Sequence, residues 1–182
     1  MIHWTEIING CKKGEPKAQR ELYDQFKARL MGLCRRYTGS REEAQDVLQD
    51  AFVKIFSRIH QLDSDDKLES WMMKIAVTTA INHYHKNKRI QYSEVEENAG
   101  DGNYELIISN VSDEYLIGLI NALPDGCRLV FNLNVVEGYG HKEIAEMLEI
   151  SESTSRSQLH HAKGILKEKL KSVGVIRFEK YA

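Results

Sequence analysis

The chain is poor in proline and cysteine. Its 182 residues include two prolines and three cysteines. So few prolines favour helix. Cys11, Cys34 and Cys127 are odd in number, widely spaced and without any CxxC pair. This argues against a disulfide scaffold or a zinc ribbon, and it predicts reduced thiols in the core.

Long apolar runs, targeting signals and catalytic motifs are also missing. No run of about 18 apolar residues occurs, and the start, MIHWTEIINGCKKGE, is neither a signal sequence nor a transit peptide. We expect a soluble, cytoplasmic protein without membrane insertion. The sequence has no nucleophile elbow, phosphate-cradling glycine loop or paired ligand motif, so we expect no enzyme. Two histidine pairs, His83 with His85 and His160 with His161, point to different helix faces, so we expect no metal or other cofactor.

The formal net charge of −2 is unevenly distributed. Between Ser93 and Tyr115 there are seven acids and no Lys or Arg, so the rest of the chain carries a net charge of +5. This segment also contains Asn and Gly and begins without helical periodicity, which is typical of a linker. We expect a domain over residues 1–92, an acidic linker over 93–111 and a second domain over 112–182.

The clearest of four helical patterns in the first domain covers residues 41–59. Ser40 and Glu43 are expected to form a capping box, and Gly39 is expected to end the preceding helix in a left-handed conformation. The helix has an apolar stripe: Ala44, Val47, Leu48, Ala51, Phe52, Ile55, Phe56 and Ile59. Its opposite face has an acidic row of Glu43, Asp46 and Asp50, with Gln49 beside them. Such a row is either a solvated surface or a docking face for a basic partner.

The next pattern, over residues 68–89, is apolar on one side and basic toward its end. The residues expected to face a core are Leu68, Trp71, Met72, Ile75, Ala76 and Thr79; those on another side are Lys74, Thr78, Asn82, His85 and Arg89. The basic end has Lys86, Lys88 and Arg89 interleaved with His83, Tyr84, His85 and Tyr92. Cations neutralise phosphate and flat rings stack on bases, which suits single-stranded or distorted DNA. A basic helix end that complements its own dipole is the alternative, but it leaves the rings unexplained.

Residues 141–171 show two amphipathic helical patterns joined by a tight polar turn. The first has Ile144, Ala145 and Leu148 on one face, and the second has Leu159, Ala162, Leu166 and Leu170. Ser151 is expected to cap the second helix, with Glu152 in its first turn. The outward stripe carries no acid: Ser153, Arg156, Ser157, His160, Lys163 and Lys167. This indicates a recognition helix for the major groove, or else a hairpin with a solvated basic face.

Two blocks of the chain resemble the extracytoplasmic-function (ECF) group of sigma factors, which direct bacterial RNA polymerase to promoters. LYDQFKARLMGLCRRYTGSREEAQDVLQDAFVKIF with LESWMMKIAVTTAINHYHKNKR resembles the family's second conserved region. LPDGCRLVFNLNVVEGYGHKEIAEMLEISESTSRSQLHHAKGILKEKL resembles its fourth. The resemblance implies an all-α fold of two small helical domains, a region 2 bundle and a region 4 helix-turn-helix, joined by a flexible acidic linker. It also implies promoter selection and assistance in promoter melting, with no catalysis.

The resemblance also assigns roles to residues. It implies core RNA polymerase, promoter DNA and an anti-sigma factor as candidate partners. The acidic row of Glu43, Asp46 and Asp50, together with Gln49, would dock on a coiled coil of the polymerase. The minus-ten element, read also by the loop over residues 62–67, would be bound by Lys74, Thr78, Asn82, His85, Lys86, Lys88 and Arg89. The minus-thirty-five element would be bound by Ser153, Thr154, Arg156, Ser157, His160 and Lys163.

Several departures from the family pattern qualify this assignment, including His161 and Gly164 where Arg or Lys is frequent. Val77 and Thr78 stand where Arg and Asn are frequent, so no minus-ten sequence can be transferred. Glu149 occupies a turn position usually held by Gly, where a left-handed backbone costs about 1 kcal/mol or more. Ser155 replaces a customary Val, so we expect a less stable helix pair.

Two other classes of protein are alternatives. A transcriptional regulator would bind operator DNA by itself and use the first domain for dimerisation or sensing. An interaction-only protein, such as an anti-sigma antagonist, would explain the acidic row but not two separate basic surfaces.

Overall fold

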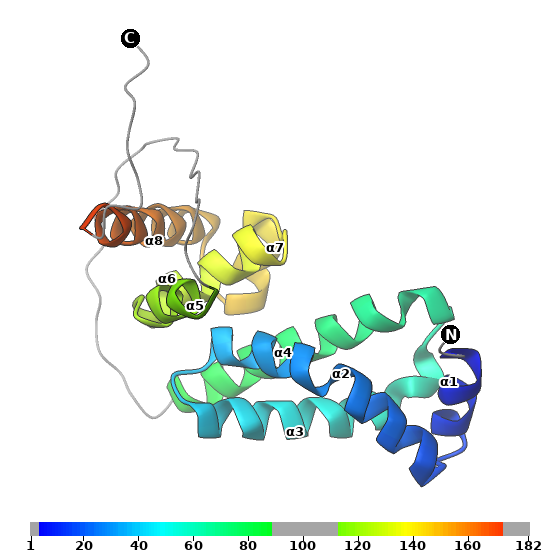
Figure 1. Ribbon diagram of the computed structural model, residues 1–182. Coiled ribbons are helices and arrows are strands. Elements are labelled where there is room, and N and C mark those ends of the chain that lie inside the picture. Colours follow the sequence, from blue (N-terminus) through cyan, green and yellow to red (C-terminus); the bar gives the residue numbers. More distant parts are fainter. Residues whose placement is uncertain (1–3, 89–112, 173–182) are drawn as a thin grey trace. The chain divides into compact units, whose positions relative to one another are not determined.

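The computed structural model describes residues 4–88 and 113–172, apart from the side chains at 87, 88, 113 and 114. Every regular element in these ranges is helical (Figure 1), which confirms the predicted all-α class. The chain divides into two compact units, Met1–Tyr92 and Ser93–Ala182. The whole of the expected acidic linker, residues 93–111, lies outside the described residues.

The first unit is a three-helix bundle with a fourth helix across one end. Its elements are α1 (Trp4–Lys12), α2 (Pro16–Tyr37), α3 (Arg41–Arg58), the 3₁₀ turns η1 (Ile59–Gln61) and η2 (Asp65–Lys67), and α4 (Leu68–Lys88). Helices α2, α3 and α4 pack against one another in all three pairs. Helix α1 contacts α2 and both 3₁₀ turns (Figure 1). The first unit therefore rests on the mutual packing of α2, α3 and α4, with α1 closing one end.

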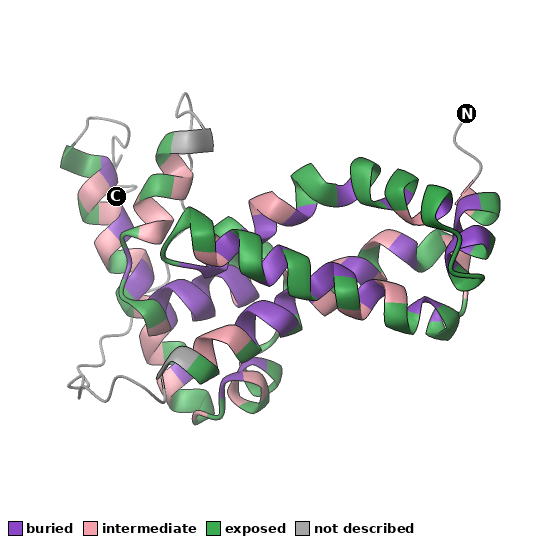
Figure 2. Cartoon of the chain, turned by 90° about the horizontal axis from the view of Figure 1, so that it is seen from below, coloured by how far each residue is buried: buried purple, intermediate pink, exposed green. Residues whose placement is uncertain are grey.

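Apolar burial between α2, α3 and α4 holds this bundle together. Each Å² of apolar area removed from water contributes about 25 cal/mol to the free energy of folding. Figure 2 shows the buried residues along the facing sides of the helices. The predicted stripe of α3 is buried along its whole length except at Phe56, which is half-buried. The predicted core face of α4 was only partly right. Trp71 and Ile75, expected to face the core, are half-buried. Val77, Ala80 and Ile81, which the prediction left out, are buried.

The α2–α3 junction differs in part from the expectation. Gly39 is not left-handed; instead Thr38 ends α2 in an extended conformation, and its hydroxyl donates to the Cys34 carbonyl at 3.0 Å. Ser40 does cap α3, accepting the Glu43 N–H at 3.1 Å. The Glu43 carboxylate accepts from the Gly39 N–H at 2.9 Å, one residue earlier than a capping box requires.

The second unit is built around its last helix. Its elements are α5 (Asp113–Asn121), α6 (Asp125–Phe131), the π-helical turn η3 (Asn132–Val136), α7 (His141–Leu148) and α8 (Glu152–Ser172). Helix α8 contacts α5, α6 and α7. The predicted α8 stripe, Leu159, Ala162, Leu166 and Leu170, is entirely buried. Ala145, expected on the core face of α7, is only half-buried.

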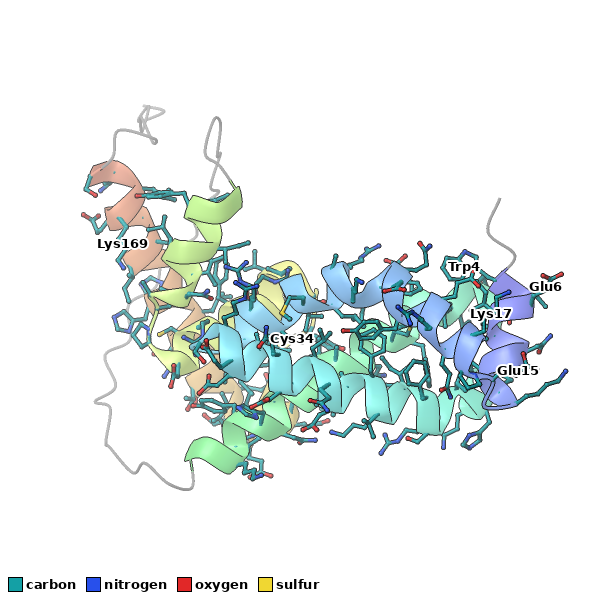
Figure 3. All side chains as sticks on the ribbon, turned by 60° about the horizontal axis from the view of Figure 1, so that its bottom comes forward. Trp4, Glu6, Glu15, Lys17, Cys34 and Lys169 are labelled. Atoms are coloured by element: carbon teal, nitrogen blue, oxygen red, sulfur yellow. The ribbon has the colours of Figure 1, made fainter. Side chains whose placement is uncertain are left out.

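All three cysteines are buried and free, as predicted. Cys34 lies on α2 (Figure 3), and burial raises the pKa of its thiol to about 12. Burial, with a smaller contribution from Glu15, raises the pKa of Cys11 to about 11. Burial also raises the pKa of Cys127. Such thiols remain protonated and unreactive at neutral pH.

Candidate functional site

The acidic row lies on the outer face of α3. Asp46, Gln49 and Asp50 are exposed, whereas Glu43 is half-buried and holds the Gly39 N–H. No ion pair or side-chain hydrogen bond among the described residues engages Asp46 or Asp50. Two uncompensated carboxylates one helical turn apart form a negative surface for a basic partner.

The same face of α3 carries an apolar residue that the sequence reading missed. Val53 is 62% exposed. It follows Asp46 by seven residues and Asp50 by three, so it lies in line with both. Its spacing of three and seven residues from the two acids could have placed Val53 on this face. A single exposed valine is common on protein surfaces, however, and does not by itself indicate a binding site.

The polar side of α4 forms a stripe of Lys74, Thr78, Asn82 and His85. The first three are exposed, and His85 is half-buried with its ring 5.7 Å from that of Tyr84. The Thr78 hydroxyl donates to the Lys74 carbonyl at 2.9 Å. Lys86 is exposed beside the stripe. The Lys88 side chain and Arg89 lie outside the described residues.

The loop before α4 is anchored at both ends and acidic between them. Leu62 and Leu68 are buried. The Ser64 hydroxyl donates to the Asp66 carboxylate, and this bond holds the pKa of Asp66 below its ordinary value. Asp63 is exposed and Asp65 half-buried. This loop offers hydrogen-bond acceptors, and its negative charge disfavours contact with phosphate.

The turn between α7 and α8 has the expected strained residue. Glu149 adopts φ 56° and ψ 43°, the left-handed conformation. The Ile150 N–H donates to the Ala145 carbonyl at 3.1 Å and so closes the turn. The Ser151 hydroxyl accepts the Thr154 N–H at 3.0 Å, which confirms the predicted cap of α8.

A buried polar contact joins α7 to α8. Ser155 is fully buried, and its hydroxyl oxygen lies 2.8 Å from His141 Nδ1. Burial is the largest cause of a lowered pKa at His141; the charge of Arg156 lowers it further, and Glu152 opposes the shift. A polar contact therefore links α7 to α8 in addition to their apolar packing.

The outward side of α8, the recognition face, contains the residues expected to read DNA. Ser153 and Arg156 are exposed, and the others are half-buried: Thr154, Ser157, His160 and Lys163. The Ser151 hydroxyl oxygen lies 2.7 Å from Ser153 Oγ and 2.8 Å from Thr154 Oγ1, so those hydroxyls also belong to the helix cap.

The expectation that this face carries no acid was wrong. Glu152 Oε2 accepts from Arg156 Nη2 at 2.9 Å. At about 3.6 residues per turn, Glu152 lies only about 40° around the helix from Arg156 and within the basic stripe. The spacing of four residues was a readable signal, but Glu152 was assigned only to the helix dipole.

Two features are absent from the described residues. No helix within residues 4–88 or 113–172 is both long enough and apolar enough to cross a bilayer. Those residues also contain no cluster of three or more His, Cys, Asp or Glu side chains suited to a metal ion.

Two family models match the chain, in order and without overlap. "Sigma-70 region 2" matches residues 22–90, from α2 through α4. "Sigma-70, region 4" matches residues 113–166, from α5 into α8. Together they span both helical units and include the acidic row, the α4 stripe and the recognition face.

Curated relatives are similar over nearly the whole chain. ECF RNA polymerase sigma factor SigW of Bacillus subtilis is 27% identical over 179 residues, covering 91% of this chain and 96% of the relative. ECF RNA polymerase sigma-E factor of Escherichia coli K12 is 27% identical over 177 residues, covering 90% and 92%.

Two solved structures share the fold. CnrH, in complex with the cytosolic domain of CnrY, matches with a TM-score of 0.50 at 17% identity, over 91% of this chain and 96% of CnrH. The sigma factor RpoE of Bartonella quintana, in complex with the anti-sigma factor NepR, matches with a TM-score of 0.53 at 16% identity, over 84% and 96%.

Proposed function

We propose a division of labour within this chain, which belongs to the ECF group of the sigma-70 family of RNA polymerase sigma factors. As an ECF sigma factor it directs transcription initiation and is not itself an enzyme. The ordered pair of region 2 and region 4 matches is the observation that carries this function. The proposal concerns which residues perform each part of it.

The acidic row of α3 is the proposed dock for core RNA polymerase. Asp46 and Asp50 support this role because they are exposed and without described counter-charges. Gln49 adds an exposed amide between them. Glu43 contributes mainly through the α3 cap, since its carboxylate already holds the Gly39 N–H. Opposite charge on the polymerase would accelerate association and fix its orientation.

The α4 stripe, with Lys86, Lys88 and Arg89, is proposed to hold the minus-ten element as its strands separate. Separating DNA costs on the order of 1.4 kcal/mol per base-pair step in lost stacking. Stacking of exposed bases on protein rings returns about 1 to 3 kcal/mol per base. The rings of Tyr84 and His85 near the stripe support such a role. Capture of the open strand would then assist melting.

The recognition face of α8 is proposed to read the minus-thirty-five element in the major groove. Arg156 is suited to base edges and Lys163 to phosphate. Ser157 and His160 add polar contacts along the same face. Ser153 and Thr154 would contribute less to base reading than expected, because their hydroxyls already meet Ser151.

We also propose a cellular location, a role for the linker and a further partner. The protein is expected to act in the cytoplasm, with residues 93–111 as an acidic tether between a domain over 1–92 and another over 112–182. An anti-sigma factor is a further candidate partner, because a solved structure of similar fold, RpoE of Bartonella quintana, is a complex with the anti-sigma factor NepR.

The experiment that tests this division compares the full chain with the holoenzyme that it forms with core polymerase. Binding of both to duplex promoter fragments is measured by fluorescence anisotropy. The proposal expects specific binding to appear with the holoenzyme and to weaken when either promoter element is shuffled. Tight, specific duplex binding by the chain alone would favour an operator-binding regulator and overturn the proposal.

A further inference from the structure

We infer that Glu152 is a positioning residue that orients Arg156 for base recognition, an inference that rests on the proposed role of α8 as reader of the upstream promoter element. The two side chains lie one helical turn apart on the recognition face. Their charged atoms are 2.9 Å apart, and the side chains are 47% and 64% exposed, respectively. Arg156 is the only arginine in α8, so this contact involves the face's one side chain able to grip a base through a planar fork.

The contact contributes only modestly to helix stability. An exposed ion pair four residues apart on a helix is only weakly stabilising, because both side chains stay largely hydrated. The cap of α8 is already made by Ser151, which accepts the Thr154 N–H. Glu152 is therefore not needed as the capping group, and its carboxylate is engaged with Arg156 instead.

The contact restricts where the guanidinium points. Arginine has five N–H donors in a fixed planar arrangement. With one Nη2 hydrogen held by Glu152, the remaining donors are presented from a narrower set of rotamers. A bidentate contact with guanine O6 and N7 needs such a fixed orientation. The carboxylate would therefore favour the correct base over loose contacts with phosphate.

The negative charge of Glu152 also acts on DNA directly. Nonspecific binding is driven by neutralisation of phosphates. An acid on the recognition face weakens this attraction for every sequence, while the oriented arginine strengthens contact with one sequence. The uniform weakening leaves the ratio of specific to nonspecific affinity unchanged, so the oriented arginine alone raises that ratio.

The chain offers a matched control on the same helix. Glu168 forms an exposed ion pair with Lys171 at 2.9 Å. It lies about 120° around α8 from Arg156, away from the recognition face. Glu168→Gln removes the same charge from the same helix, whereas Glu152→Gln removes it beside Arg156.

The test uses holoenzyme formed from the full chain and core polymerase. Its DNA is a promoter fragment selected by transcription from a fragment library, together with the same fragment carrying a shuffled upstream element. The measured quantity is the dissociation constant for the shuffled fragment divided by that for the intact fragment. It is determined for wild type, E152Q, R156A, the double variant and E168Q. Thermal unfolding of each variant accompanies the binding data.

The inference expects the ratio to fall about tenfold in E152Q, the scale of one good bidentate base contact. Binding to the shuffled fragment should tighten, and the double variant should match R156A, because Glu152 acts through Arg156. E168Q should keep the wild-type ratio. An unchanged ratio in E152Q, or the same fold-loss whether or not Arg156 is present, would overturn the inference. A wild-type ratio of one would instead overturn the proposed role of α8.

Discussion

His141 Nδ1 and the Ser155 hydroxyl oxygen lie 2.8 Å apart and join the two helices of the helix-turn-helix. A valine at position 155 would pack by shape alone. Here a fully buried hydroxyl is satisfied by the neighbouring ring, so the site combines burial with a directional bond. The lower stability expected from Ser155 is therefore offset at least in part by this hydrogen bond.

Ser155→Ala is expected to destabilise the second unit by about 1 kcal/mol, because the hydrogen bond is lost and the ring nitrogen loses its partner. His141→Ala removes the same bond from the other side. The measurement is hydrogen exchange of α7 and α8 amides in both single variants and the double variant. The bond predicts a double-variant loss smaller than the sum of the single losses; strictly additive losses would show that the contact contributes nothing.

The second unit is also expected to lose stability in mild acid. Burial, and then the charge of Arg156, lower the pKa of His141, so protonation is harder in the folded unit than in the unfolded chain. The contribution is fully present above the ordinary histidine pKa of about 6.5 and declines as the pH falls through that value toward the lowered one. Thermal unfolding at pH 7.5 and 5.5 checks this. His141→Asn should reduce the difference between the two; an equal difference in the variant would assign it to other groups.

Glu149→Gly is expected to stabilise the second unit by about 1 kcal/mol, because glycine adopts the left-handed conformation without steric cost. The observed φ of 56° is the basis for this expectation. Glu146→Gly is the matched control, since Glu146 lies within α7 and glycine there should destabilise by about 1 kcal/mol. Chemical denaturation measures the stability of each of the two variants, and hydrogen exchange of the α7 amides provides a second measure. A loss of stability in both variants would contradict a strained turn.

Reversal of Asp46 and Asp50 to Lys is expected to weaken polymerase binding by about 1 kcal/mol or more, if this face meets a basic partner. Glu21→Lys, an exposed reversal on α2, should have little effect. Val53→Ser tests whether the exposed valine in line with both acids adds apolar contact. Affinity for core polymerase is measured at two salt concentrations. Equal affinity for wild type and the double reversal would return the row to a solvated surface.

Helical spacing predicted much of the architecture because it reports directly on burial. The stripes of α3 and α8 were predicted almost residue by residue, and Ser151 and Ser40 were recognised as caps. The core face of α4 was harder to predict, because α4 is buried on more than one face and its apolar residues do not form a single stripe.

Details of backbone and side-chain direction were less accessible. The end of α2 depends on Thr38, whose hydroxyl competes for the Cys34 carbonyl; nothing in the residue order distinguishes this from a glycine cap at Gly39. The π-helical turn after α6 has no evident signal in its residues. The Glu152–Arg156 contact could have been anticipated from spacing alone, yet its bearing on DNA emerges only when both side chains are seen on the recognition face.

Transcription reconstituted from purified chain, core polymerase and a library of upstream DNA fragments tests the central claim most directly. The account predicts RNA synthesis from a small set of fragments that share two spaced elements, with loss of that selection when Arg156 and Lys163 are replaced by Ala and polymerase association retained. Failure of the chain to initiate from any fragment while bound to core polymerase would contradict it.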